Sequence, residues 1–217
     1  MIINQGSLAA ATTGFQAIFN GALAGAPNND HYNRIAMTVP SSTRQNTSPS
    51  LAEFFQIREW LGERVYQNLS HHQFTIENLD FEGSVAVDRN DIEDDVLGIY
   101  NPMFQQMGSA TAAFPNTKVF SLLPQGFSTP CYDGQYFFDT DHPGFDADGD
   151  EISVSNHMGG SGTPWYLTAS SNALKPVIFQ KRRDFTFVAM DAANDEAVFA
   201  NKKFRYGVDG RMNAGFG

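Results

Sequence analysis

The residues of this chain that could do chemistry gather between positions 131 and 151. Cys131 is the one cysteine of the 217 residues, and His142 and several aspartates follow it closely. A thiol nucleophile needs an imidazole base within hydrogen-bond reach, so this set could form a thiol-dependent hydrolase. However, the flanking sequences TPCYDG and DTDHPG match no protease signature. A lone cysteine in an aromatic run is more often buried by packing, so a thiol enzyme is an alternative and not the main interpretation.

The same stretch is rich in carboxylates, and hard cations such as calcium prefer several carboxylate oxygens from one loop. Asp146, Asp148 and Asp150 suit positions one, three and five of a standard calcium loop. The sixth position, however, holds Glu151 where that loop needs glycine, and the twelfth holds His157. We therefore expect an exposed acidic loop. A metal-dependent enzyme centred on this segment is kept as an alternative beside the thiol enzyme. The cluster comprises Asp139, Asp141, Asp146, Asp148, Asp150 and Glu151.

No other motif supports an enzyme. His71 and His72 would point to opposite faces of a strand, which makes them a poor metal pair. The chain has no G-x-S-x-G, H-E-x-x-H, Walker or dinucleotide-binding pattern. The sequence therefore predicts no catalytic, cofactor-binding or metal-binding residue.

The charge distribution argues against nucleic-acid recognition and is compatible with self-association. The formal net charge is -10, whereas affinity for phosphate backbones comes mainly from clustered Lys and Arg. Residues 1–170 carry 6 basic and 19 acidic side chains, and residues 171–217 carry 8 basic and 5 acidic ones. An acidic body and a mildly basic tail can pair with copies of the same chain.

Length and apolar content predict a folded protein of one large domain or two lobes. No segment reaches the eighteen uninterrupted apolar residues of a membrane span, and the first residues lack the basic start of a secretory signal. A single cysteine excludes an intrachain disulfide and agrees with a reducing compartment. We expect a protein made and used in a cytoplasm.

The first half of the chain alternates helices with polar segments. Residues 7–23 indicate a weak amphipathic helix, and the polar stretch after it, with a candidate strand at Ile35–Val39, resembles an arm. Ser50 and Glu53 form a capping box for a helix that runs to Leu69. The segment 73–90 alternates apolar and polar residues, which predicts a long exposed hairpin of two strands.

Apolar residues recur at helical spacing from Asp91 to Ala113, with Asn90 as the expected cap and a bend expected at Pro102. A short helix and turn should follow near residues 118–127. Four strands are expected near the end of the chain, at 176–180, 184–190, 196–200 and 202–210.

Five blocks of sequence together resemble the gpT family, the major head subunits of Mu-like phages and prophages. The similarity covers most of the chain from about Leu51 onward, and each block alone would be a weak match. The blocks are FEGSVAVDRNDIEDDVLGIY, MGSATAAFPN, LLPQGF, CYDGQYFFDTDHP and VFANKKFRYGVDGRMNAGFG.

The resemblance implies an α+β fold of the Hong Kong 97 (HK97) type, the fold of many major capsid proteins. Such a subunit has an N-terminal arm, an extended loop, a spine helix, a peripheral domain and an axial domain. In this sequence the mapping gives 1–49 as the arm, 50–72 as a helix and connector, 73–90 as the extended hairpin loop, and 91–217 as the spine helix with the peripheral and axial domains.

The implied function is that of a structural shell subunit of a virion. Copies would form hexamers and pentamers of an icosahedral head in the bacterial host cytoplasm, together with other head proteins and around double-stranded DNA. Family members usually continue for several dozen residues past the segment resembling RYGVDGRMNAGFG, which suggests a short or truncated subunit. An accessory head-decorating protein is a further alternative. The expected contacts between subunits are made by Arg64, Asp80, Glu82, Arg89, Asp91, Asp94 and Asp95.

Overall fold

The structure is a computed structural model, and it describes most of the chain. The described residues are 4–26, 30–49, 73–94, 96–146, 150–171, 174–192 and 194–217. The helix expected over 51–69 and the side chains of Arg64, Asp95 and Asp148 lie outside these ranges. No described helix is both long and apolar enough to cross a membrane.

The chain divides into two compact units, each built from three separate segments. Unit 1 comprises Met1–Tyr32, Asn78–Thr117 and Lys181–Met212. Unit 2 comprises Asn33–Glu77, Lys118–Gln180 and Asn213–Gly217. The chain passes between the units several times, so neither unit is a continuous stretch of sequence.

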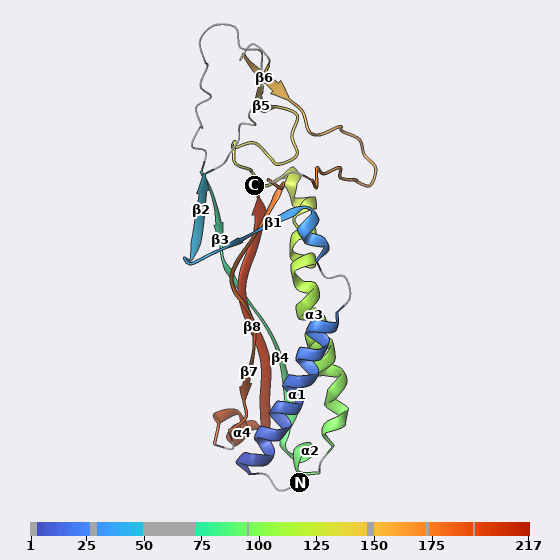
Figure 1. Cartoon of the computed structure of the whole chain (residues 1–217), viewed down its shortest axis with the longest axis vertical. Helices are drawn as coiled ribbons and strands as arrows, with labels where there is room; N and C mark the ends of the chain where they lie inside the picture. Colours follow the sequence, from blue (N-terminus) through green and yellow to red (C-terminus); the bar gives the residue numbers. More distant parts are fainter. Residues whose placement is uncertain are drawn as a thin grey trace. The chain divides into compact units, whose positions relative to one another are not determined.

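Four strands form the largest sheet, in the order β1-β7-β8-β4 (Figure 1). They are β1 (Ala36–Pro40), β7 (Val177–Met190), β8 (Lys203–Phe216) and β4 (Leu79–Asp88). Strand β4 pairs antiparallel with β8, from Leu79 opposite Met212 to Asp88 opposite Lys203. The two strands expected at 176–180 and 184–190 are one strand, β7, because the charged residues between them stay in extended conformation with exposed side chains. A solvated strand face accepts such charges.

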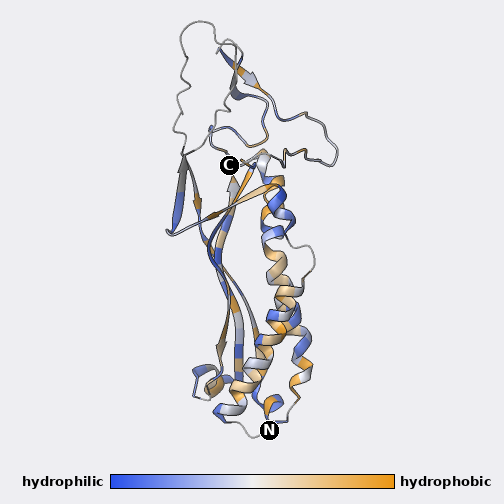
Figure 2. Cartoon of the chain, viewed as in Figure 1, coloured by the Kyte–Doolittle hydropathy of each residue, from blue (hydrophilic) through white to orange (hydrophobic). Residues whose placement is uncertain are grey.

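Unit 1 is built around two helices that pack on this sheet. Helix α1 (Gln5–Gly25) begins at a capping box between Asn4 and Ser7, which confirms the helix expected at 7–23. The ring of Phe15 in α1 stacks on Phe104 of α3 (Asn101–Phe120) at 4.2 Å, and both rings meet Tyr206 of β8 edge-on. Apolar and polar residues are interspersed along both helices, as expected for helices with one buried face (Figure 2). The core cluster comprises Leu8, Ala11, Phe15, Val87, Ile92, Phe104, Val198, Phe204 and Tyr206.

The helix expected from Asp91 to Ala113 is divided in the structure. Helix α2 (Arg89–Glu93) and the 3-10 helix η2 (Leu97–Tyr100) precede α3, and the cap of α2 is Asp88 rather than Asn90. The bend expected at Pro102 is wrong, because Pro102 lies in the first turn of α3, where its missing N–H costs no helical hydrogen bond. Helix α3 also continues through Pro115, which was expected to lie beyond its end.

Residues 73–90 do not form a hairpin with each other, so that expectation is wrong. Strand β3 (Gln73–Glu77) pairs antiparallel with β2 (Gln45–Pro49), while β4 joins the large sheet beside β8. Alternation of apolar and polar residues indicates a strand but does not identify its partner. The strand expected at 196–200 is also wrong: residues Glu196–Asn201 form helix α4.

Unit 2 contains two short ribbons, β2 with β3 and β5 (His142–Phe145) with β6 (Glu151–Val154). The 3-10 helix η1 (His31–Arg34) spans the boundary at which the first segment of unit 2 begins, and η3 (Leu123–Phe127) lies near the start of its second segment. The buried Gln180 side-chain amide donates to the carbonyl oxygen of Ile76 at 3.0 Å. The ring of Phe137 stacks on Phe216 at 4.1 Å and so ties the end of β8 to the loop after η3.

Candidate functional site

Three of the expected subunit contacts, Arg89, Asp91 and Asp94, lie where β4 runs into α2, in unit 1. The Asp88 carboxylate accepts a hydrogen bond from the backbone N–H of Asn90 at 2.9 Å and begins α2. The Tyr100 hydroxyl accepts from the Asp88 N–H at 3.2 Å and donates to the Asp91 carboxylate. Burial raises the pKa of Tyr100, and its hydrogen bond to Asp91 raises it further, so the hydroxyl keeps its proton. Asp91 therefore holds the junction together.

Other expected contact residues lie nearer the solvent. Arg89 pairs with Glu93 one turn later at 3.0 Å, with about half of each side chain accessible. Asp80, on the exposed side of β4, lies 3.6 Å from Arg211 of the neighbouring strand. Exposed pairs of this kind contribute little to folding stability. Glu82 accepts a hydrogen bond from Ser84, and Asp94 follows the last turn of α2.

The structure brings the candidate thiol, imidazole and carboxylate together in unit 2, as the sequence suggested. They belong to Cys131, His142 and Asp133. The Cys131 thiol donates to Asp133 Oδ1 at 3.0 Å, and His142 Nδ1 lies 2.7 Å from Asp133 Oδ2. The Asp133 side chain is only 2% exposed. One ligand atom from each residue lies within 4.8 Å of the others. The carboxylate thus stands between the thiol and the imidazole.

This order of side chains does not activate the thiol. Burial raises the pKa of Cys131 to about 12, and the hydrogen bond to Asp133 also raises it. A nucleophilic cysteine requires the opposite, a lowered pKa and an imidazole in contact with the sulfur. The arrangement therefore counts against the thiol-enzyme alternative.

The acidic loop forms the connection between β5 and β6. Asp146 and Asp150 bond to each other through backbone and side-chain atoms, at 3.0 and 2.9 Å. Asp139 accepts a hydrogen bond from the backbone N–H of Thr140, which lowers the pKa of its carboxyl group. Within the described part of the chain, the cluster at Cys131 is the one group of metal-ligating side chains, and these aspartates form no second group. Asp146 and Asp150 serve as turn residues of the β5–β6 hairpin, and Asp139 precedes β5.

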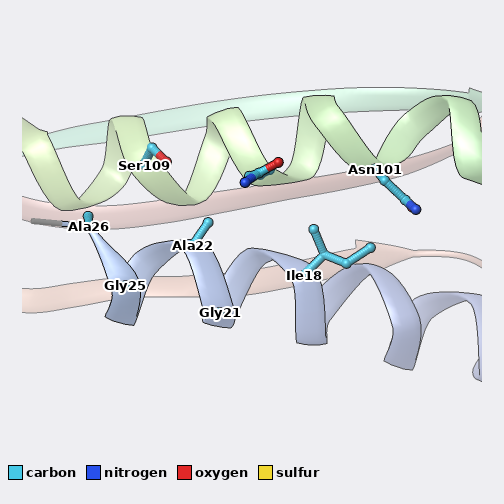
Figure 3. Close-up of a pocket in the computed structure, with 8 residues that line it drawn as sticks. Ile18, Gly21, Ala22, Gly25, Ala26, Asn101 and Ser109 are labelled. Carbon is cyan, nitrogen blue, oxygen red and sulfur yellow. The ribbon is translucent and has the colours of Figure 1, made fainter.

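A groove of about 640 Å³ lies between α1 and α3 in unit 1 (Figure 3). Small residues of α1, including Gly21, Ala22 and Gly25, face Asn101 and Ser109 of α3. The helices approach closely at Gly108, where an added Cβ would lie 2.5 Å from the carbonyl oxygen of Phe19. Nothing in the sequence patterns considered above predicts this groove. The glycines and alanines of α1 were its only signal.

The comparisons identify the class of protein. The chain matches the procapsid of bacteriophage JBD30 with a TM-score of 0.82 and 43% identity, over 99% of this chain and 73% of that chain. It therefore has the fold of a phage major capsid protein, which confirms the expected α+β fold of HK97 type.

The family whose description is Mu-like prophage major head subunit gpT matches residues 8–217. The chain is 44% identical over 223 residues to the major capsid protein of Escherichia phage Mu, covering 100% of this chain and 72% of that protein. It is 42% identical over 211 residues to the Mu-like prophage FluMu major head subunit of Haemophilus influenzae, covering 94% of this chain and 68% of that protein. The chain belongs to this family of major head subunits.

The resemblance noted in the sequence is thus confirmed, and the protein is a major capsid subunit and a component of a virion. The family consists of structural proteins, which confirms that the chain is not an enzyme. This assignment replaces both the enzyme alternative and the accessory head-decorating alternative.

Proposed function

We propose that copies of this subunit assemble as hexamers and pentamers into an icosahedral shell around double-stranded DNA, with other head proteins, in the cytoplasm of a bacterial host. The observation that carries this proposal is the match to the JBD30 procapsid over nearly the whole chain. The net charge of -10 supports it, because an inner wall that bound DNA tightly would hinder packaging and ejection.

We propose that β2 and β3 belong to the extended loop of the shell subunit. These two strands are antiparallel partners and bracket residues 50–72. This placement replaces the segment 73–90, half of which belongs to the large sheet as β4. Helix α3 is then the spine helix, and its N-terminus lies ten residues later than expected.

Unit 1 corresponds to the peripheral domain in this proposal and unit 2 to most of the axial domain. Unit 1 contains most of α3 together with β4 and parts of β7 and β8. The border then crosses the chain near residues 32, 77, 117, 180 and 212, positions that the sequence alone could not give. Helix α1 belongs to the proposed arm, 1–49, but packs into the core of unit 1.

We assign the contacts between subunits to the charged residues at the start of α2 and on β4. Arg89, Asp80, Glu82 and Asp94 are exposed there. The proposed set also includes Asp91, Arg64 and Asp95, of which the last two lie outside the described residues. An acidic surface of one copy can meet the basic tail of another, since residues 171–217 carry a net positive charge.

The test is a pair of double variants examined by electron microscopy and by light scattering after size exclusion. Arg64→Glu with Arg89→Glu reverses two charges, and we expect a folded subunit that no longer forms shells. Arg64→Lys with Arg89→Lys keeps the charge and is the matched control, which should still assemble. Normal shells from the Glu variant would remove these residues from the interface. Wild-type protein that stays monomeric under every condition would contradict self-assembly itself.

A further inference from the structure

One cluster of side chains in unit 2 could bind a metal ion, a property that a shell subunit does not require. The cluster consists of Cys131, Asp133 and His142. Thiolate, carboxylate and imidazole are the three protein ligands that zinc takes most often. One ligand atom of each lies within 4.8 Å of the other two. We propose that these three side chains bind one zinc ion, which fastens the turn at Cys131 to strand β5.

The charges in this cluster suit a divalent cation. A zinc-bound cysteine is a thiolate, so Cys131 and Asp133 would together supply two negative charges to the ion. The Asp133 carboxylate is almost fully buried, and burying a charge is costly unless it is paired. A zinc dication neutralises the Asp133 carboxylate more completely than the two side-chain hydrogen bonds that this carboxylate accepts in the structure.

The required movement is small. Tetrahedral zinc with bonds of about 2.3 Å to sulfur and about 2.0 Å to oxygen or nitrogen separates sulfur from oxygen by about 3.5 Å, and nitrogen from oxygen by about 3.3 Å. The Cys131 sulfur lies 3.0 Å from Asp133 Oδ1, and His142 Nδ1 lies 2.7 Å from the other carboxylate oxygen, Oδ2. The sulfur and the imidazole nitrogen lie within 4.8 Å of each other. The two separations from the carboxylate oxygens must open by about half an ångström, and the sulfur must stand about 3.5 Å from the nitrogen, changes that side-chain rotation can supply.

The backbone holds the ligands in place for this change. The Cys131 N–H donates to the carbonyl of Gln135 at 2.8 Å, and Gly134, with φ +87°, donates to the Cys131 carbonyl at 3.2 Å. His142 begins β5 and stands opposite Val154 of β6. A tight turn and the end of a paired strand therefore present the three side chains, and a site built on such fixed elements loses little entropy on binding.

The structure assigns His142 Nδ1, which lies against Asp133 Oδ2, as the imidazole ligand of the ion. Nε2 of His142 is buried and has no hydrogen-bond partner among the described residues. A fixed partner at Nε2 would select one tautomer, as second-shell groups usually do. With Nδ1 on the ion, the ring proton lies on Nε2, and a water molecule is the acceptor that this buried N–H requires. Water completes the fourth position.

The test uses the full chain and two metal probes, Co²⁺ and Zn²⁺. Cobalt bound to a thiolate gives a sulfur-to-metal absorption band, and any such band must come from Cys131 because the chain has one cysteine. We expect a band that saturates at one Co²⁺ per chain and disappears when Zn²⁺ is added. Calorimetry with Zn²⁺ should give the same stoichiometry.

Variants locate the ion. Cys131→Ser and His142→Gln should each weaken zinc binding on the order of 100-fold, at least as much as loss of an outer-shell partner does. His157→Gln is the matched control, because His157 packs against Phe127 outside the cluster and the variant should bind zinc normally. Zinc binding that survives both ligand variants would place the ion elsewhere and overturn the proposal. If the variants do not fold, the wild-type protein decides: absence of the cobalt band overturns the proposal by itself.

Discussion

Replacing Gly108 by alanine tests the close approach of α1 and α3. A Cβ at position 108 would lie 2.5 Å from the carbonyl oxygen of Phe19 and 2.8 Å from the Cβ of Ala22. The first of these contacts is with backbone, so no side-chain rotation can relieve it. The helices would have to move apart, which would loosen the stack of Phe15 on Phe104 beside them.

The magnitude follows from two opposing effects. Overpacking of this kind costs about 1–3 kcal/mol. Alanine also gains roughly 1 kcal/mol over glycine inside a helix. Because the tightest contact is with backbone, we take the upper half of the cost, which leaves a net destabilisation of about 1–2 kcal/mol. For a protein of this size the Tm should fall by about 2–8 °C.

The assay is urea and thermal unfolding of the full chain, followed by circular dichroism. Gly14→Ala is the matched control, because Gly14 is exposed on α1 and has open space around its Cα. That variant should be more stable than the wild type by about 0.5–1 kcal/mol. If Gly108→Ala is stabilised to the same extent as Gly14→Ala, the helices do not pack as described, and the reasoning fails.

Two further predictions concern the same unit. Phe104→Ala should lower the free energy of unfolding by about 3–5 kcal/mol, because Phe104 is fully buried. Phe199 is 90% exposed, so Phe199→Ala should change this free energy by less than about 0.5 kcal/mol. Equal effects of the two variants in urea unfolding would contradict the assigned core. Burial raises the pKa of Tyr206 above its ordinary value of 10.0, so the unfolded chain loses this proton first and stability should fall as the pH rises above 10. Tyr206→Phe should reduce that fall in urea titrations between pH 8 and 11, and an unchanged slope would show that Tyr206 does not cause it.

Local patterns gave the individual elements more reliably than their partners. The helix at 7–23 and the strands at Ile35–Val39 and 202–210 were expected and are present as α1, β1 and β8. The hairpin at 73–90 was wrong because β4 pairs with β8, more than a hundred residues away. Strand pairing over such a distance depends on the packing of the whole unit, which periodicity does not report.

Short apolar runs were a second source of error. The run at 196–200 suits a strand by composition, yet it forms α4, with Asp195 at the cap position and Glu196 in the first turn. An acidic residue in the first turn stabilises a helix through its dipole, and this signal was available in the sequence. For runs of five or six residues, the end signals are more informative than the apolar pattern.

The cluster in unit 2 was predicted in part. The sequence indicated Cys131, His142 and an unspecified aspartate, and the structure brings Asp133 between them. Which residue stands in the middle determines the chemistry, because an imidazole beside the sulfur would favour catalysis and a carboxylate beside it favours a protonated thiol. That order depends on the turn around Gly134, whose left-handed conformation no spacing rule could supply.

Some of the proposed contact residues are bound tightly within their own subunit, and others are not. The first kind is needed for folding, and the second kind is available for contacts with neighbouring copies. Asp91 is bound to Tyr100 at the start of the core helices, so its replacement should impair folding before it affects assembly. Arg89 pairs with Glu93 on an exposed helix turn, a pair that contributes only about 0.3–0.5 kcal/mol. Arg89 can therefore exchange Glu93 for a carboxylate of a neighbouring copy at little cost. Arg89 is therefore a suitable residue for the charge-reversal test of assembly, and Asp91 is not.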